Sequence, residues 1–144
     1  MRLTTRTNLA MRTLMFCAVN SGCVVRKAEV ASVCNVSENH LAQVIHRLAQ
    51  LGFLHTTRGR SGGLQLGRPA ALISVGEVIR AFESAVPFTE CMTGGEGTCP
   101  LAATCRLKCA LAGALEVFYA ALDPVTLSDL TEDNDGLSRI LSVA

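Results

Sequence analysis

The chain has 144 residues, 49% of them hydrophobic, and a formal net charge of +1, which suffices for one domain with an extension. It has no tryptophan and a single tyrosine, so a stacking platform for single-stranded nucleic acid is not expected. Arginines interrupt the apolar residues near the start, and no apolar run is long enough to span a bilayer. We therefore expect a cytoplasmic protein with no membrane contact, whose seven cysteines form no disulfide framework.

Charge is distributed unevenly along the chain. Residues 1–80 hold ten Lys or Arg against three Glu, a net charge of +7, whereas residues 81–144 hold three basic against nine acidic residues, a net charge of −6. A basic segment attracts a polyanion, and an acidic segment repels it. The first eighty residues are therefore the part of the chain in which we expect nucleic acid to bind.

Three helices are predicted in the basic half, over residues 5–20, 26–33 and 38–51. The third has the clearest pattern, an apolar stripe at helical spacing, which consists of Leu41, Val44, Ile45, Leu48 and Leu51. The short turn before it predicts a helix-turn-helix, whose second helix enters the major groove of DNA. Its outward side chains near the N-terminal end are the candidate base-reading residues: Ser37, Asn39, His40 and Gln43, with Arg47 at the edge. The alternative is an ordinary solvated helix face.

Two short β-prone runs, over residues 53–57 and 64–66, flank the glycine-rich segment from Arg58 to Gly63, a pattern that predicts a β-hairpin. Directly after a helix-turn-helix, such a hairpin is the wing of a winged helix. Its glycines let the tip approach a sugar–phosphate backbone, where Arg58 and Arg60 supply positive charge. A nucleotide-binding loop is the weaker alternative, because the glycine spacing matches no known phosphate-binding motif.

A helix over residues 73–84 and a longer helix over about 101–122 are predicted after the wing. The longer helix has an extended apolar stripe, which is typical of a helix that pairs with its symmetry mate in a homodimer. Packing against the first helix is the alternative, and both contacts are compatible. One further helical turn is predicted at residues 127–130, and the acidic residues 131–136 are expected to be mobile.

Four cysteines lie within nineteen residues, in the segment CMTGGEGTCPLAATCRLKC from Cys91 to Cys109. Its glycines allow the segment to fold back on itself, so that its thiolates can gather around zinc or an iron–sulfur cluster. Zinc sites usually contain the spacing CxxC, which this sequence lacks, so a zinc-stabilised winged helix ranks below a cluster. No cofactor fingerprint and no Cys/His/Asp arrangement indicates an enzyme.

The predicted fold is mainly α with a small β-hairpin: a winged helix-turn-helix plus a long dimerisation helix. We expect a DNA-binding domain over residues 1–84, a cysteine-rich loop over 85–106, and the dimerisation helix with a C-terminal tail over 101–144. Cys17, Cys23 and Cys34 lie outside the loop, and structural roles are expected for them.

Five segments are diagnostic in combination: MRLTTRTNLAMRTL at the start, RGRSGGLQLGRPA at the wing, ISVGEVIRAFE after it, EC…CPLAATCRLKCAL in the cysteine-rich segment, and ALDPVTLSDL near the end. Over nearly its whole length, the chain resembles the family of small bacterial winged-helix repressors that carry an iron–sulfur cluster, which includes NsrR, IscR and RirA. The resemblance is greatest to the nitric-oxide-sensitive NsrR branch, through CRLKCAL, FYAALDPVTLSDL and GLSRIL. TNLAMRTLMFCA and GRSGGLQLGRPA are also similar to the RirA-type iron regulators.

The resemblance implies that Cys91, Cys99 and Cys105 bind the cluster, which we expect to be 4Fe–4S in preference to 2Fe–2S. For the fourth ligand, an aspartate that NsrR-like proteins donate from the partner subunit corresponds here to Asn8. The histidine that IscR-like proteins use corresponds to Lys108, which cannot bind iron while protonated. Cys109, one helical turn after Cys105, is the other candidate.

The function implied is a repressor that binds double-stranded operator DNA as a homodimer and responds to nitric oxide. An iron-responsive regulator of the RirA type, or a cluster-status regulator of the IscR type, is the alternative.

Overall fold

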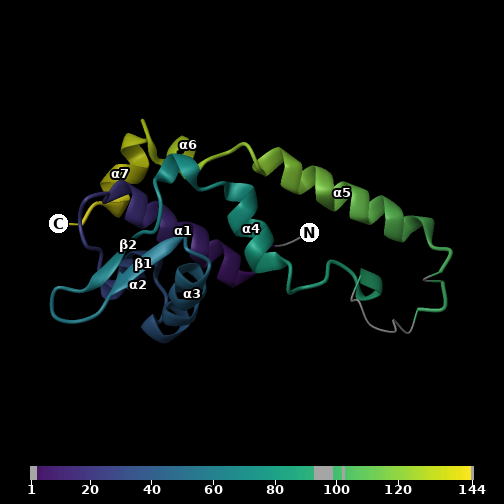
Figure 1. The fold of residues 1–144 in the computed structure, drawn as a ribbon, viewed down its shortest axis with the longest axis horizontal. Helices are drawn as coiled ribbons and strands as arrows, with labels where there is room; N and C mark the ends of the chain where they lie inside the picture. The colour runs from purple at the N-terminus through teal and green to yellow at the C-terminus, as the bar shows by residue number, and fades with distance from the viewer. Residues whose placement is uncertain (1–2, 93–98, 102, 144) are drawn as a thin grey trace.

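The computed structural model describes residues 3–92, 99–101 and 103–143 of the chain (Figure 1). Within these ranges the elements follow in the order α1 (Thr5–Val19), α2 (Lys27–Cys34), α3 (Glu38–Gln50), β1 (Leu54–Thr57), β2 (Gly63–Leu66), η1 (Ala70–Leu72), α4 (Val75–Glu83), η2 (Glu90–Met92), α5 (Arg106–Leu122), α6 (Leu127–Thr131) and α7 (Asp135–Leu141). The elements η1 and η2 are short 3-10 helices.

Most elements gather in one lobe, from which α5 projects as an arm (Figure 1). Helix α1 runs through the lobe and contacts α2, α3, α4, α6, α7 and β2, whereas α5 contacts the lobe through α4. This arrangement confirms the predicted winged helix-turn-helix with an additional long helix. Among the described helices, including the 17-residue α5, none combines the length and the apolar character that crossing a bilayer requires.

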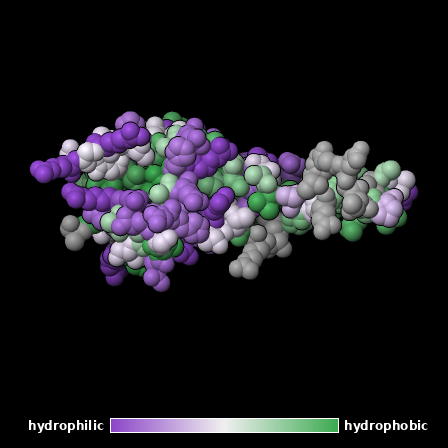
Figure 2. Space-filling model, turned by 90° about the horizontal axis from the view of Figure 1, so that it is seen from below, coloured by the Kyte–Doolittle hydropathy of each residue, from purple (hydrophilic) through white to green (hydrophobic). Residues whose placement is uncertain are grey.

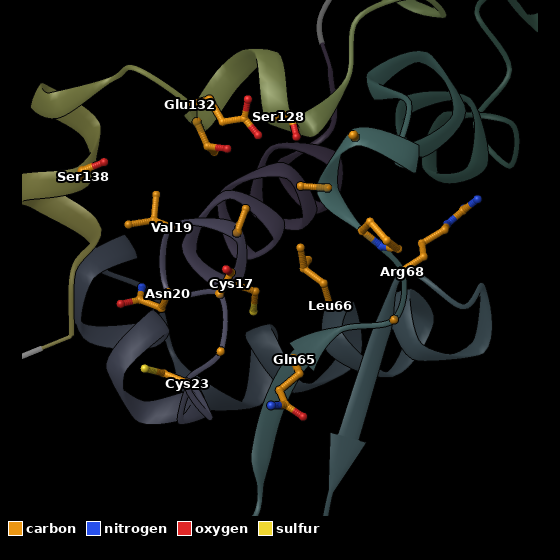
Figure 3. Close-up of a pocket in the computed structure, with 18 residues that line it drawn as sticks. Cys17, Val19, Asn20, Cys23, Gln65, Leu66, Arg68, Ser128, Glu132 and Ser138 are labelled. Carbon is orange, nitrogen blue, oxygen red and sulfur yellow. The ribbon is translucent and has the colours of Figure 1, made fainter.

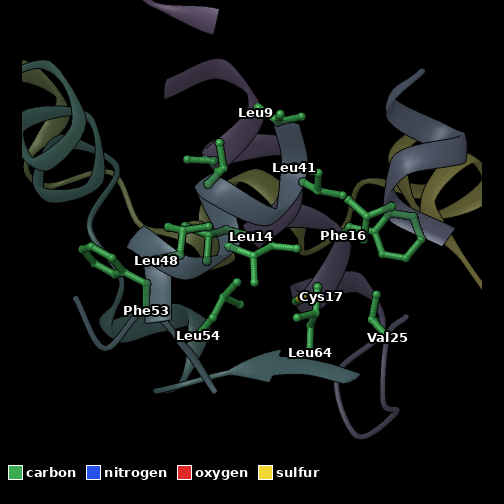
Figure 4. Packing of buried hydrophobic residues seen from close by; sticks show 14 of the residues in the cluster. Leu9, Leu14, Phe16, Cys17, Val25, Leu41, Leu48, Phe53, Leu54 and Leu64 are labelled. Carbon is green, nitrogen blue, oxygen red and sulfur yellow. The ribbon is translucent and has the colours of Figure 1, made fainter. Parts of the chain in front are cut away.

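The hydrophobic core of the lobe lies where α1, α3 and the wing meet (Figure 4). Leu14 of α1 and Leu48 of α3 have no exposed surface, and Phe53 at the start of the wing is 1% exposed. Leu54 and Leu64 close the core from the two strands of the wing. Removal of these side chains from water is the main term that stabilises the lobe.

Capping and turn residues delimit the helix-turn-helix. Asn35 ends α2 in the left-handed conformation, at φ 52° and ψ 52°, which Asn adopts more easily than most residues. Ser37 then begins α3, because its hydroxyl accepts a hydrogen bond from the His40 N–H at 3.3 Å. Gly52, at φ +75°, follows α3 and turns the chain into the wing. Local chemistry therefore sets the position of α3.

The wing is attached to the start of the helix-turn-helix as well as to α3. Its strands pair antiparallel, with Leu54 opposite Leu66 and Thr57 opposite Gly63. Val25, just before α2, pairs with Leu64 of β2 in a single antiparallel β-bridge. Its N–H donates to the Leu64 carbonyl at 3.1 Å, and the Leu64 N–H donates back at 2.7 Å. This β-bridge fixes the orientation of the wing relative to α2 and α3.

The arm is attached by a close contact between α4 and the C-terminal end of α5. A Cβ atom added at Gly76 would lie 2.7 Å from the Asp123 backbone nitrogen. Arg80 forms an ion pair with the Asp123 carboxylate at 2.9 Å, and its guanidinium lies 4.3 Å from the centre of the Tyr119 ring. These contacts determine the direction in which α5 leaves the lobe.

Two elements differ from the sequence prediction. Helix α5 begins at Arg106 and not near residue 101, because Cys105 has an extended backbone, and the described residues from 101 to 104 are exposed. Without packing, an additional helical turn there gains too little to form. Helix α7 was not predicted. Asn134 caps it by accepting from the Leu137 N–H at 3.1 Å, and Leu141 is 7% exposed where α7 packs on α1.

We predict that Gly76→Ala destabilises the protein, although alanine favours a helix interior over glycine by about 1 kcal/mol. The added methyl group would clash with the Asp123 backbone, and overpacking of this kind costs about 1–3 kcal/mol. Gly136→Ala in α7 is the matched control, because the nearest atom to its added Cβ would be 3.8 Å away. Urea unfolding should show a loss of stability for the first variant and none for the second. Equal stabilities would contradict the close contact.

Candidate functional site

The exposed side of α3 carries the predicted base-reading residues. Asn39, Gln43 and Arg47 are exposed along this helix, so their side chains are available to a ligand. Ser37 is exposed but its hydroxyl caps the helix, and His40 is half-buried. The structure therefore presents two free amides, the groups that can pair bidentately with adenine in the major groove.

A groove of about 690 Å³ separates the wing from α3. The wing-tip residues Arg58 and Arg60 line it together with Arg26 and Lys27 at the start of α2. Sequence reasoning found the first two and missed the second two. The sequence did contain a sign of these two residues. Cations at the start of a helix oppose the helix macrodipole, so their presence there suggests a role other than helix stability. Lys27 is paired with Glu38 at 3.1 Å, whereas the Arg26 side chain has no acidic partner among the described residues and is available to an anion in the groove.

Most cations near this groove are not neutralised within the chain. The ion pairs found among the described residues are Lys27–Glu38, Arg68–Glu77, Arg80–Glu116 and Arg80–Asp123. In the part of the chain that the structure describes, Arg26, Arg47, Arg58 and Arg60 have no acidic partner within 4.0 Å. Figure 2 shows that hydrophilic residues dominate the lobe seen from the side of α3 and the wing. Unpaired cations beside an amide-bearing helix are typical of a surface that binds duplex DNA.

The cysteine-rich segment lies by the arm, away from α3 (Figure 1). Cys91 belongs to η2, Cys105 is the N-cap residue of α5, and Cys109 lies one turn into α5. Cys91 and Cys105 are half-buried, Cys99 and Cys109 are exposed, and all four are free thiols. The Thr89 hydroxyl lies 3.2 Å from the Cys91 sulfur. Residues 93–98, between the first two cysteines, are outside the described residues.

Within the described residues, no three Cys, His, Asp or Glu side chains are gathered at distances suited to one metal ion. The donor set nevertheless fits an iron–sulfur cluster, because three accessible or half-buried thiols on one short segment supply three of the four ligands that such clusters usually have.

Asn8, the candidate ligand from the first helix, is exposed and lies in the lobe. In Figure 1 the start of α1 and the cysteine-rich segment are well apart within one chain. This separation is compatible with donation to a second copy of the chain, as the family resemblance implies. Cys109 is exposed on the arm beside Cys105, so both candidates for the fourth ligand are accessible.

Glu83, the last residue of α4, connects the chain that leads into the cysteine-rich segment to the start of α1. One of its carboxylate oxygens accepts from the Thr4 N–H at 2.8 Å, from the Thr4 hydroxyl at 3.0 Å and from the Thr7 hydroxyl. Thr7 is fully buried, and its N–H donates to the Thr4 hydroxyl at 3.2 Å. A single carboxylate thus completes the N-cap of the helix that carries Asn8. Sequence reasoning missed this contact.

The cysteines outside this segment contact the core or a separate cavity. Cys17 and Cys23 line a cavity of about 840 Å³ at the C-terminal end of α1 (Figure 3). Burial raises the pKa of Cys17 to about 12 and also raises the pKa of Cys34, against an opposing effect of Arg12. Cys17 and Cys34 therefore remain protonated at neutral pH, and both belong to the hydrophobic core.

Apolar side chains of α5 remain exposed along the arm. Leu107 is 65% exposed and Val117 is 69% exposed, whereas Tyr119, where α5 meets α4, is 7% exposed. Hydrophobic residues are visible along the arm in Figure 2. An exposed apolar surface on a projecting helix is typical of a helix that pairs with a second copy.

Comparison with known proteins agrees with this geometry. The model of the Rrf2 family, described as "Iron-dependent Transcriptional regulator", matches residues 3–133. The chain is 39% identical over 143 residues to the HTH-type transcriptional regulator NsrR of Bacillus licheniformis, a match that covers 99% of this chain and 100% of the relative. It is 38% identical over 143 residues to protein aau3 of Rhizobium meliloti, covering 99% of this chain and 93% of the relative.

Solved structures have the same architecture. The oxidised form of CymR from Staphylococcus aureus has a TM-score of 0.71 at 26% identity, over 92% of this chain and 97% of that protein. IscR of T. potens has a TM-score of 0.68 at 24% identity, over 92% of this chain and 88% of that chain, which shows a shared fold. With the family model, the full-length relatives and the winged-helix structure in agreement, the chain belongs to the Rrf2 family of DNA-binding transcriptional regulators.

Proposed function

We propose that this chain is a homodimeric repressor that binds operator DNA, holds an iron–sulfur cluster at Cys91, Cys99 and Cys105, and releases DNA in response to nitric oxide. The observation that carries the proposal is the place of the cysteine-rich segment in the fold. It connects α4, whose last residue is hydrogen-bonded to α1, with α5, the projecting apolar helix. A ligand of this segment can therefore act on the DNA-binding lobe and on the dimer contact together.

Successive parts of the chain carry the three proposed functions. Residues 1–84 bind DNA and residues 85–106 hold the cluster. The region expected from residue 101 onward forms the dimer, through a helix that begins at Arg106. Such a dimer presents two copies of α3, which can enter successive major grooves about one turn of DNA apart.

Base readout is assigned to the N-terminal half of α3. Asn39 and Gln43 offer amides to the base edges, while Ser37 and His40 lie at the end of the helix that enters the groove. Arg47 lies at the edge of the same face. Arg58 and Arg60 at the wing tip contact the sugar–phosphate backbone, because guanidinium groups pair well with phosphate.

Three thiolates, from Cys91, Cys99 and Cys105, would hold the cluster, which we expect to be 4Fe–4S. When bound, such a cluster supplies an iron atom that a diatomic molecule such as nitric oxide can reach. The fourth ligand is Asn8 of the partner subunit or Cys109. A neutral amide oxygen binds iron less strongly than a carboxylate, so ligation by Asn8 would leave one iron accessible, as a sensor requires.

The contacts of Glu83 connect this segment to the DNA-binding surface. While Cys91, Cys99 and Cys105 are held together, the chain that leaves Glu83 has a defined path, and α4 and α1, which Glu83 joins, keep a defined position relative to α5. Release of the cysteines frees that path and allows α1 and α4 to move relative to α5. In a dimer this movement changes the spacing of the two α3 helices, which weakens binding at both half-sites.

An iron-responsive regulator is the second candidate, favoured by the description of the family as iron-dependent. In that case occupancy of the same cysteines reports the supply of iron, and nitric oxide is not the signal. The ligands, the dimer contact and the DNA-binding residues are the same in both proposals.

Serine substitution should identify the ligands. We expect Cys91→Ser, Cys99→Ser and Cys105→Ser each to lose most of the iron and visible absorbance of anaerobically purified protein, because each removes one ligand. Cys23→Ser, which changes an exposed cysteine outside the segment, is the control and should keep both. Of Asn8→Ala and Cys109→Ser, the variant that loses iron lacks the fourth ligand. Full iron in all three loop variants would refute the proposed site.

Nitric oxide should release the repressor from DNA. We expect an anaerobic titration of the cluster-bearing protein with nitric oxide to bleach its visible absorbance and to abolish operator binding in parallel. Iron chelation is the comparison. If nitric oxide leaves operator binding intact while chelation abolishes it, the iron-responsive function replaces the nitric-oxide response.

Glu83 should be required for communication between the cysteines and DNA. Glu83→Ala removes the acceptor of three hydrogen bonds, so the ratio of operator affinities with and without the cluster should fall by at least about fivefold, within the usual range of allosteric coupling. Glu83→Gln keeps an oxygen acceptor and should retain the ratio. Because the ratio compares two forms of one variant, a simple loss of stability does not change it. An unchanged ratio in Glu83→Ala would show that coupling follows another route.

A further inference from the structure

A second groove lies beside α3, on the side opposite the wing. It has a volume of about 250 Å³ and is lined by α1, α3 and α4. Arg6 contributes from the first turn of α1, and Gln43 and Arg47 contribute from α3. The other lining residues are small or apolar: Val44, Ala81, Phe82 and Ala85. None of these lining residues is acidic.

Within the described part of the chain, the two arginines of this groove are not used for ion pairs. Among the residues that the structure describes, neither Arg6 nor Arg47 has a carboxylate within 4.0 Å, whereas Arg68 and Arg80 do. Arg6 also lies where it disfavours its own helix, because a cation in the first turn opposes the macrodipole. Both arginines are exposed. Arg47 lies in the last turn of α3, where a cation favours its helix, so only Arg6 is unfavourable for its own helix. Two exposed arginines in one groove are positioned to attract an anion.

The two grooves lie on opposite sides of α3. The groove next to the wing uses Ala42, His46 and Ala49 of this helix, whereas the second groove uses Gln43, Val44 and Arg47. A helix inserted in the major groove of B-DNA is flanked by the two sugar–phosphate backbones, about 12 Å apart across the groove. One cationic groove on each side of the recognition helix matches the two backbones.

We infer that Arg6 and Arg47 form a binding site for a backbone phosphate of the operator, on the strand opposite the one that the wing contacts. The inference rests on the DNA binding of the proposed function and adds α1 to the DNA-binding surface. The first turn of α1 is also the turn that Glu83 holds through Thr4 and Thr7. Through Glu83, the phosphate site is therefore connected to the chain that leads into the cysteine-rich segment.

Phosphate ethylation on a duplex that the wild-type protein selects from a random pool tests this site. Alkylation of one phosphate removes its charge, so interference maps every contacted phosphate to a strand and a position. Wild-type protein should show interference on both strands. Within each half-site, Arg6→Ala should lose the interference on one strand and keep the signal from the wing on the other strand. Arg58→Ala should lose the wing signal and keep the signal that Arg6 gives, and in the symmetric dimer each loss recurs on the opposite strand of the second half-site.

Affinity measurements provide the quantitative test. Arg6→Ala should bind the same duplex roughly tenfold more weakly, and the slope of log affinity against log salt should fall by about 1 for each protomer. Arg139→Ala removes the same charge from an exposed position on α7 and should change neither quantity. Arg6→Ala should unfold at the wild-type temperature or slightly above it, because the replaced cation opposes the macrodipole of α1, and this result separates lost contact from lost structure.

Each outcome has a distinct meaning. If wild-type protein selects no duplex, the proposed function itself fails. If wild-type protein binds but Arg6→Ala keeps the wild-type interference pattern and salt slope, the phosphate site is refuted while DNA binding through α3 and the wing stands. An affinity loss in Arg6→Ala that leaves the interference pattern intact also refutes it, because the contact would then not be to one phosphate.

Discussion

Burial of α1 on several sides is the constraint on which the rest of the structure depends. This helix contacts every other helix of the lobe and one strand of the wing, and Ala10 and Leu14 along it have no exposed surface. Its two ends serve different partners. The C-terminal end packs against α7, while the N-terminal end is capped by Thr4 and Glu83. Because packed cores shift between discrete arrangements and deform little otherwise, a change at either end of α1 reaches the recognition helix.

The basic side chains of residues 1–80 fall into two groups, according to whether an acidic partner lies beside them among the described residues. Arg68 and Arg80 are paired with acids and lie over aromatic rings, so they hold the wing and the arm in place. Arg58 and Arg60, and on the other side of α3 Arg6, have no such partner among the described residues. A net charge of +7 over residues 1–80 cannot make this distinction, which depends on the position of each carboxylate.

The cysteine-rich segment lies outside the hydrophobic core of the lobe. Cys91, Cys99, Cys105 and Cys109 are all outside the buried cluster. The arm contacts the lobe through a hydrophobic cluster of Val75, Ile79 and Tyr119 and through a glycine, Gly76, that admits the Asp123 backbone. A junction of this kind can move without unfolding the lobe, which the proposed response requires. The same lobe could thus serve relatives that respond to different signals.

The sequence by itself determined the elements that have local causes. The cap at Ser37, the turn at Asn35 and the glycine-rich wing tip have such local causes, because side-chain hydrogen bonds and φ preferences act over a few residues. The resemblance of five sequence segments to a known family then indicated the family and the candidate cysteine ligands. Only the tertiary structure decided the start of α5, the existence of α7, and the sites that join distant residues: Glu83 to Thr4, and Arg6 to Arg47. These depend on burial and on proximity across the fold, which no spacing within the chain encodes.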